Sequence, residues 1–235
     1  MAWDPVWESI FTNQAWGRYP GEDLIRFVAK NFYAPRPPPD RASVRFLEVG
    51  FGTGTNLWFL AREGFSANGI EGSKSAEAIA RKRLDNECPG WSSAPRNGEL
   101  VVGDMMNLHW PDATFDALID SEAVYCNDFE ESCRIYREMY RVAKPGAMLF
   151  VRTFATECWG DGIGTAVGTR RYIAGAGPMH GKGPSRFTAE DELVELLGPW
   201  KIIEINLIQR SLDAQRQVIR EWVVTAEKPA HDEYR

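Results

Sequence analysis

Short apolar runs and amphipathic stretches alternate along most of this 235-residue chain. Runs of strand length occur at 45–49, 67–71, 99–104, 115–120 and 147–154, and two late runs cover 200–209 and 216–227. Between the early runs, 56–64, 75–84 and 129–143 carry apolar residues at helical spacing. Another helix is predicted at 188–197. The pattern therefore predicts seven strands, with helices between most of them.

Strands that alternate with helices form parallel βαβ units, so we expect an α/β, doubly wound, Rossmann-like sheet with helices on both faces. The last two runs are joined only by "SLDAQR", which is a hairpin length. One late strand must then run antiparallel in an otherwise mostly parallel seven-stranded sheet. In such sheets, ligands bind beyond the carboxyl ends of the strands, beside the first strand.

The chain divides into two parts. "GEDLIRFVAKNFY" (21–33) has helical spacing, and the proline-rich "APRPPPDRAS" (34–43) cannot continue that helix. We therefore expect an N-terminal helical segment and linker over 1–40 and a main domain over 41–235. Eight glycines fall within 156–185, so 154–187 is predicted to be a lid rather than ordinary connecting chain.

Composition narrows the class of protein. The net charge of −6 argues against general nucleic-acid binding. The sequence has no run of 18 apolar residues, so no membrane span is predicted. The start of the sequence lacks the pattern of a signal peptide. Four cysteines without a CxxC pair and three scattered histidines argue against zinc and disulfides, and fit a reducing cytoplasm. We expect a cytoplasmic protein without a metal, as a monomer or a homodimer.

The stretch "FLEVGFGTGTN" (46–56) places Gly50, Gly52 and Gly54 between a strand and a helix. Glycines there let a ligand approach the backbone, and the helix N-terminus offers free N–H groups. The alternative is a tight turn in which the glycines serve packing alone. The dinucleotide fingerprint GxGxxG needs glycine at position 55, where this chain has Thr55. A pyrophosphate-binding loop is therefore disfavoured.

This stretch resembles motif I of the class I S-adenosylmethionine-dependent methyltransferases, in which GxGxG follows an acidic residue, here Glu48. Further family motifs follow in order: "GIEGS", "VVGDMMNL", "FDALIDSEAVYCN" and "MYRVAKPGAMLFV". The resemblance covers 45–151. It implies that Glu71 bonds the ribose of S-adenosylmethionine, that Asp104 bonds the adenine, and that Met105 packs on the adenine ring.

The resemblance also implies a wider set of cofactor contacts within these motifs: Gly50, Gly52, Thr53, Gly54, Asn56, Gly72, Ser73, Gly103, Met106, Asp120 and Ser121. Many members of the family close over the cofactor with an N-terminal aromatic and a basic residue. Trp16, Arg18 and Tyr19 are candidates for that cover, and Arg18 for the methionyl carboxylate. Packing of the aromatics on the domain, with Arg18 in solvent, is the alternative.

The acceptor is expected to be a small molecule, because no basic domain is appended for RNA or protein. The lid region 151–186 carries five basic residues against two acidic ones, which favours an anionic acceptor, phosphorylated, carboxylated or nucleotide-linked. Arg152, Arg170, Arg171, Tyr172, Arg186 and Tyr125 are the predicted substrate contacts. A hydroxyl acceptor needs a base, and Glu122, Tyr125 and His180 are the candidates.

Two other classes remain open. A nicotinamide-dependent reductase is disfavoured by Thr55 in the glycine-rich turn. A non-catalytic domain that binds an adenosyl ligand is disfavoured by the acidic residues at 48, 71 and 104. The chain is also similar to bacterial methyltransferases of surface-sugar or small-metabolite pathways.

Overall fold

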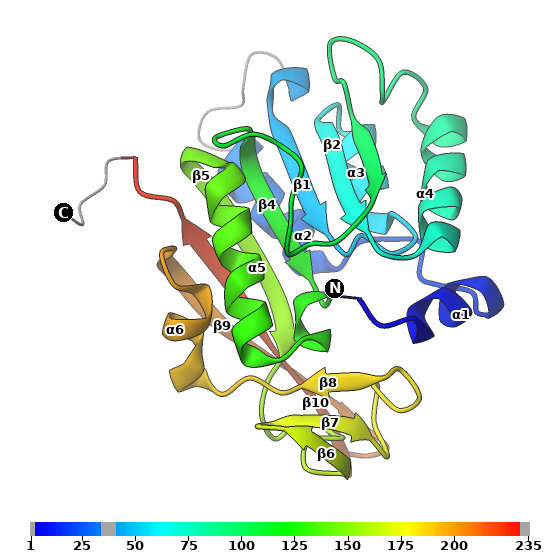
Figure 1. Cartoon of the computed structure of the whole chain (residues 1–235), viewed down its shortest axis with the longest axis vertical. Coiled ribbons are helices and arrows are strands. Elements are labelled where there is room, and N and C mark those ends of the chain that lie inside the picture. The colour runs from blue at the N-terminus through cyan, green and yellow to red at the C-terminus, as the bar shows by residue number, and fades with distance from the viewer. Residues whose placement is uncertain (1–2, 34–40, 231–235) are drawn as a thin grey trace.

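A computed structural model describes residues 3–33 and 41–230 of the chain. Its seven-stranded sheet has the order β3-β2-β1-β4-β5-β10-β9 (Figure 1). The strands are β1 Arg45–Val49, β2 Ser66–Glu71, β3 Glu99–Val102, β4 Phe115–Ser121, β5 Ala143–Phe154, β9 Lys201–Leu212 and β10 Gln217–Glu227. Only β10 runs antiparallel to its neighbours, β5 and β9. The predicted doubly wound sheet with one antiparallel late strand is confirmed.

Helices cover both faces of the sheet. On one face, α2 Glu22–Val28, α3 Thr55–Arg62 and α4 Lys74–Glu87 pack on a core that includes Phe46 and Ile119. On the other face, α5 Phe129–Val142 and α6 Leu193–Leu197 pack on a core that includes Leu47 and Leu118. Neighbouring residues of one strand thus enter opposite cores, which is why the central strands read as continuous apolar runs.

The helix boundaries follow local chemistry. Asp128 and Glu131 form a capping box at the start of α5, and Ser73 caps α4 through the N–H of Ala76. After α2 the chain continues as one π-helical turn, Ala29–Tyr33, and a 3₁₀ turn, Arg41–Ser43, leads into β1. Residues 34–40 of the predicted proline-rich linker lie outside the described residues. The late helix predicted at 188–197 is shorter, because a 3₁₀ turn, Glu190–Glu192, precedes α6.

The N-terminal segment begins with a helix, α1 Val6–Asn13, whose position was not predicted from the sequence. The Glu8 carboxylate accepts hydrogen bonds from the Ser73 hydroxyl at 2.6 Å and from the Ser75 hydroxyl and N–H at the start of α4. Carboxylates are favoured at a helix N-terminus by its free N–H groups and positive end. This contact attaches α1 to the main domain.

The predicted lid is more ordered than its glycine content suggested. It contains a second, three-stranded antiparallel sheet: β6 Gly164–Gly168, β7 Arg171–Ala174 and β8 Pro184–Arg186. Ala174, Met179 and Phe187 pack with Tyr125 and Phe154 in a third apolar core. Figure 1 shows this sheet and α1 at the same end of the molecule, toward which the parallel strands point.

Candidate functional site

The glycine-rich turn between β1 and α3 divides into two parts with different roles. Gly50 has a φ of +64°, and a Cβ there would meet the Cβ of Ala123 at 2.4 Å, so only glycine fits. Gly50 and Gly52 border a cavity, whereas Gly54 does not. A Cβ on Gly54 would meet the Ala80 Cβ at 2.6 Å. Gly54 therefore lets α3 and α4 approach each other, which is the packing role that the sequence left open.

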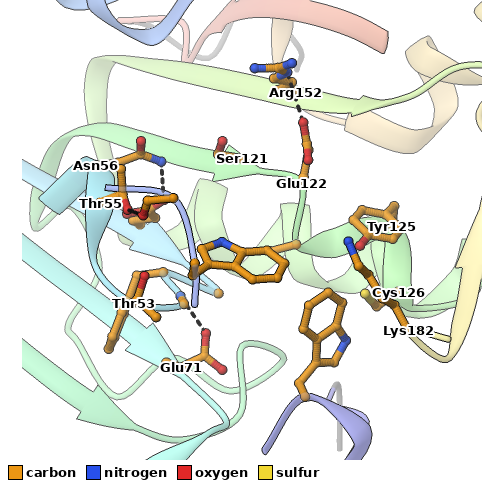
Figure 2. A pocket seen from close by; sticks show the side chains of 18 of the residues that line it. Thr53, Thr55, Asn56, Glu71, Ser121, Glu122, Tyr125, Cys126, Arg152 and Lys182 are labelled. Atoms are coloured by element: carbon orange, nitrogen blue, oxygen red, sulfur yellow. Dashed lines mark hydrogen bonds and ion pairs between the residues drawn. The ribbon is translucent and has the colours of Figure 1, made fainter. Parts of the chain in front are cut away.

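The cavity has a volume of about 300 Å³, within the range of small-molecule sites, and lies at the carboxyl ends of β1, β2 and β4 (Figure 2). Four parts of the chain line it. They are the N-terminal segment (Trp3, Asp4, Trp7, Phe11, Trp16, Gly17, Tyr19, Gly21), the β1 end and glycine turn (Glu48, Gly50–Thr53, Thr55, Asn56), the ends of β2 to β5 (Glu71, Met105, Ser121–Ala123, Tyr125, Cys126, Arg152, Phe154) and the lid (Pro178, Met179, Lys182).

Glu71 joins the ends of β1 and β2 at the cavity wall. One carboxylate oxygen accepts the N–H of Gly52 at 2.8 Å, and the other accepts the N–H of Ser73 at 2.9 Å. Burial raises the pKa of Glu71, against the effect of these backbone donors. Each carboxylate oxygen has a second lone pair, so Glu71 can still accept hydrogen bonds from two ligand hydroxyls.

Glu48 has an unsatisfied oxygen at the cavity. Its Oε1 accepts the Asn56 side-chain N–H at 2.6 Å, whereas its buried Oε2 has no hydrogen-bond partner among the described residues. Burial raises the pKa of Glu48 to about 8. A buried acceptor without a partner costs about 1–3 kcal/mol. A ligand ammonium group would satisfy this oxygen, so the residues present fit the aminoacyl end of S-adenosylmethionine.

Several residues predicted to contact the cofactor do not line the cavity: Arg18, Gly54, Gly72, Ser73, Gly103, Asp104, Met106 and Asp120. Arg18 forms an exposed ion pair with Glu87 at 2.8 Å. The Trp3 ring lies against Gly72, where a Cβ would meet it at 2.1 Å. Asp104 Oδ1 accepts a hydrogen bond from the N–H of Met106 at 3.0 Å. Their contacts with a cofactor stay predictions.

Asp120 has a structural position instead. It is fully buried, and its oxygens accept the Tyr136 hydroxyl at 2.6 Å and the N–H groups of Ala123 and Val124 at 3.0 and 3.1 Å. Burial raises the pKa of Asp120, although these three donors oppose that effect. Asp120 therefore shapes the turn that presents Ser121 and Glu122 to the cavity.

Glu122, Tyr125 and Arg152 come together at the other end of the cavity from Glu71 (Figure 2). Arg152 Nε lies 3.0 Å from Glu122 Oε1. Burial, followed by the nearby Glu221 carboxylate, raises the pKa of Glu122 to about 8, against the effect of Arg152. Tyr125 is buried, and burial raises its pKa well above the usual value, so its hydroxyl stays protonated.

The other predicted lid contacts lie elsewhere. His180 is exposed, and its Nδ1 lies 3.0 Å from the carbonyl oxygen of Ala174, away from the cavity. Arg170 pairs with Glu192 at 2.8 Å, and Arg171 donates to the Cys126 carbonyl at 2.9 Å. Arg186 is 2% exposed and lies over the Phe129 ring. Tyr172 packs near Phe187.

Sequence reasoning missed much of the cavity wall. Trp3, Asp4, Trp7, Phe11, Cys126, Phe154 and Met179 were not among the predicted site residues. Lys182 is one of the five basic residues of the lid region for which an anionic acceptor was predicted. A signal for part of this set was present. In "MAWDPVWESIF", positions 3, 6, 7, 10 and 11 are apolar at helical spacing. An amphipathic helix must pack its apolar face against another apolar surface. This pattern was therefore a signal that the N-terminal stretch covers part of the main domain.

Parts of the chain are similar to known methyltransferases. Residues 46–146 match the family model described as a methyltransferase domain. The chain is 29% identical to norajmaline N-methyltransferase of Rauvolfia serpentina, over 57% of this chain and 42% of that protein. It is 30% identical to demethylmenaquinone methyltransferase of Thermotoga maritima, over 46% of this chain and 42% of that protein. The chain thus spans less than half the length of these curated relatives.

Solved structures share the fold. An S-adenosylmethionine-dependent methyltransferase from Methanosarcina mazei matches with a TM-score of 0.66 and 24% identity, over 80% of this chain and 93% of that one. A Burkholderia thailandensis 1,6-didemethyltoxoflavin N1-methyltransferase, solved with that compound and S-adenosylhomocysteine, matches with a TM-score of 0.62 and 16% identity, over 94% and 81%.

Among the described residues, no helix is long and apolar enough to cross a membrane, and no cluster of His, Cys, Asp or Glu side chains could hold a metal ion. The family match covers β1 to β4, the glycine turn and three acidic residues at the cavity, Glu48, Glu71 and Glu122. The chain therefore contains a region similar to a methyltransferase domain, over 46–146, and shares the fold of S-adenosylmethionine-dependent methyltransferases.

Proposed function

We propose that this protein transfers the methyl group of S-adenosylmethionine to a nitrogen or oxygen of a small acceptor. The observation that carries the proposal is the continuity of one cavity, which has Glu71 and Glu48 at one end and Glu122 with Tyr125 at the other. Two of the similar proteins are named as N-methyltransferases, which supports nitrogen as one candidate atom.

The residues present suit the parts of the cofactor. Glu71 would hold the ribose hydroxyls, Met105 the adenine ring and Glu48 Oε2 the ammonium group. The cavity wall carries four carboxyl groups, those of Asp4, Glu48, Glu71 and Glu122, against two basic side chains. Such a site favours a sulfonium cation over a pyrophosphate. When bound, the cofactor supplies an electrophilic methyl group, and the surrounding side chains exclude water and orient the acceptor.

We propose that residues 1–40 act as the cofactor cover, with α1 as its described helix. Trp16 and Tyr19 line the cavity, as do Trp3, Trp7 and Phe11 from the same segment. Trp7, Phe11 and Trp16 pack on one another with ring centroids 5.5–6.0 Å apart. The aromatic cluster thus forms one cohesive cover that Glu8 attaches to α4.

Replacing Glu8 with alanine should weaken S-adenosylhomocysteine binding by about 3- to 10-fold, because charge-assisted hydrogen bonds attach the cover to α4. Isothermal titration calorimetry measures the affinity. Glu22→Ala is the matched control, since Glu22 forms only an exposed pair with Arg26 within α2. A Glu8→Ala protein that binds as tightly as the parent chain would show that the segment only packs on the domain.

We propose further that the acceptor has a flat apolar body and carries a phosphate or carboxylate. Aromatic rings of Trp7, Trp16, Tyr125 and Phe154 line its end of the cavity. Of the two cations there, Arg152 is paired with Glu122 and Glu221, whereas the Lys182 ammonium lies over the Trp16 ring, 5.1 Å from its centroid. Lys182 is therefore better placed than Arg152 to meet an anion, and it replaces the lid arginines as the leading candidate.

The function is tested by the formation of S-adenosylhomocysteine, measured with a panel of amines, phenols and phosphorylated or carboxylated aromatic compounds. For the preferred anionic acceptor, Lys182→Ala should raise the Michaelis constant about 10-fold, the scale of one charged hydrogen bond, and leave S-adenosylhomocysteine affinity unchanged. Arg170→Ala is the control in the same lid. An equal effect of Arg170→Ala would restore the lid arginines as substrate contacts. A neutral or cationic preferred acceptor would refute the anion, and cofactor binding without turnover on any acceptor would favour a non-catalytic domain.

A further inference from the structure

Glu122 is held in an unusual backbone conformation. Its φ is +59°, the left-handed region that non-glycine residues rarely adopt, and its N–H donates to the Arg152 carbonyl at 2.8 Å. Such a residue costs about 1–3 kcal/mol and persists only where its surroundings impose it. About a third of the Glu122 side chain is exposed, and the residue lines the cavity. The strained turn therefore presents a carboxyl group to the acceptor end of the cavity.

Arg152 divides its interactions unequally between two carboxyl groups. Its Nη2 donates a hydrogen bond to Glu221 Oε2 at 2.5 Å. Its Nε lies 3.0 Å from Glu122 Oε1, yet this buried nitrogen has no partner with hydrogen-bond geometry among the described residues. Glu221 is 6% exposed on β10 and does not line the cavity. The Arg152 guanidinium is thus hydrogen-bonded to Glu221, whereas its contact with Glu122 is an ion pair without hydrogen-bond geometry.

We propose that Glu221 is a positioning residue for methyl transfer: by binding the Arg152 guanidinium, it keeps the Glu122 carboxyl group basic toward the acceptor. This inference rests on the proposed function. In the reaction, the acceptor's lone pair forms the new bond to the methyl carbon. The carbon–sulfur bond breaks with its electrons left on sulfur, and the proton lost by the acceptor passes to the Glu122 carboxylate.

Electrostatics explain why a second carboxylate is needed. An arginine paired with Glu122 alone would hold the pKa of that carboxyl low and make it a poor base. Despite its burial, hydrogen bonds from Glu122 and Arg152 hold the pKa of Glu221 below its usual range. Of the two carboxyl groups, Glu122 therefore binds a proton more readily than Glu221. The other groups whose charges act on this cluster are Lys182 of the lid, Tyr125, Cys158, Asp23 of α2 and Arg210 of β9.

The proposal is tested without an acceptor, by infrared spectroscopy of protonated carboxyl groups in the full chain between pH 5 and 10. Glu122→Gln identifies the Glu122 band, which should titrate near pH 8 in the parent protein. In Glu221→Gln the same titration should move down by about one pH unit or more, because one neighbouring negative charge is removed. Glu221→Asp should restore it. Glu227→Gln, at the far end of β10, should leave it unchanged.

Thermal melts of every variant separate positioning from a purely structural role. A Glu221→Gln protein with a lowered melting temperature and an unmoved Glu122 titration would overturn the proposal, because Glu221 would then only join β5 and β10. The proposal would also be overturned if the Glu122 band of the parent protein disappeared with a midpoint below pH 6. The proposed function fails independently if no acceptor yields S-adenosylhomocysteine while the infrared titration behaves as expected.

Discussion

Replacing Glu122 with glutamine is expected to lower the turnover number for a hydroxyl acceptor by about 100-fold or more, the usual contribution of a general base. Glutamine keeps the size of the side chain and can still contact Arg152, but it cannot take the proton that the acceptor loses. Glu130→Gln is the matched control, since Glu130 is exposed on α5 and does not line the cavity. Steady-state kinetics at saturating cofactor measure the difference.

The pH dependence of this step has a defined sign. Burial raises the pKa of Glu122 to about 8, and the protonated form cannot act as a base. With a hydroxyl acceptor, kcat/KM should therefore increase as the pH rises toward and through this value, and Glu122→Gln should remove the increase. A neutral amine needs no base in the transition state. An unchanged turnover in Glu122→Gln with a hydroxyl acceptor would exclude Glu122 as the base.

Replacing Glu71 with alanine is expected to weaken S-adenosylhomocysteine binding by about 1.5–3 kcal/mol, or about 10- to 150-fold, the scale of charged hydrogen bonds. The loss has two physical sources. The ribose hydroxyls would lose a carboxylate acceptor, and the N–H groups of Gly52 and Ser73 would lose theirs. Glu77→Ala on α4 is the control, because Glu77 pairs only with Arg81 of the same helix.

A 2′-deoxy analogue of S-adenosylhomocysteine separates these two sources. The parent protein should prefer the natural ligand, whereas Glu71→Ala should bind both forms about equally, since the hydroxyl has lost its acceptor. Calorimetry of both ligands with both proteins completes the cycle. A folded Glu71→Ala variant that retains the preference would show that another residue reads the ribose, and retained affinity for both ligands would refute the assignment altogether.

The placement of the predicted site residues shows where sequence reasoning succeeds and where it stops. Glu48 and Glu71 lie at the ends of neighbouring parallel strands, and those ends must meet at one edge of a sheet. The order of strands and the glycine turn therefore sufficed to bring these residues together. For Arg152, the position on β5 was enough to place it at the same edge, but not to reveal its partner on β10.

The lid arginines illustrate the limit. Their sequence shows an excess of positive charge, but charge alone does not say which partner each side chain meets. Arg170 meets Glu192, and Arg186 is enclosed beside Phe129, so neither reaches the cavity. In short glycine-rich strands, the alternation of apolar and polar residues is weak. The sequence of the lid therefore did not predict its small sheet.

By itself, the sequence determined the layer architecture, the antiparallel late strand and the acidic residues at the strand ends, because these depend on hydrophobic period and chain order, which are local. Only the tertiary structure decided which side chains enclose the cavity. Trp3 lies on Gly72, Glu8 attaches α1 to α4, and Glu221 binds Arg152 across strands. Each of these contacts joins residues more than 60 positions apart in the sequence. Such contacts follow from packing and charge pairing in three dimensions, for which the linear pattern carries no signal.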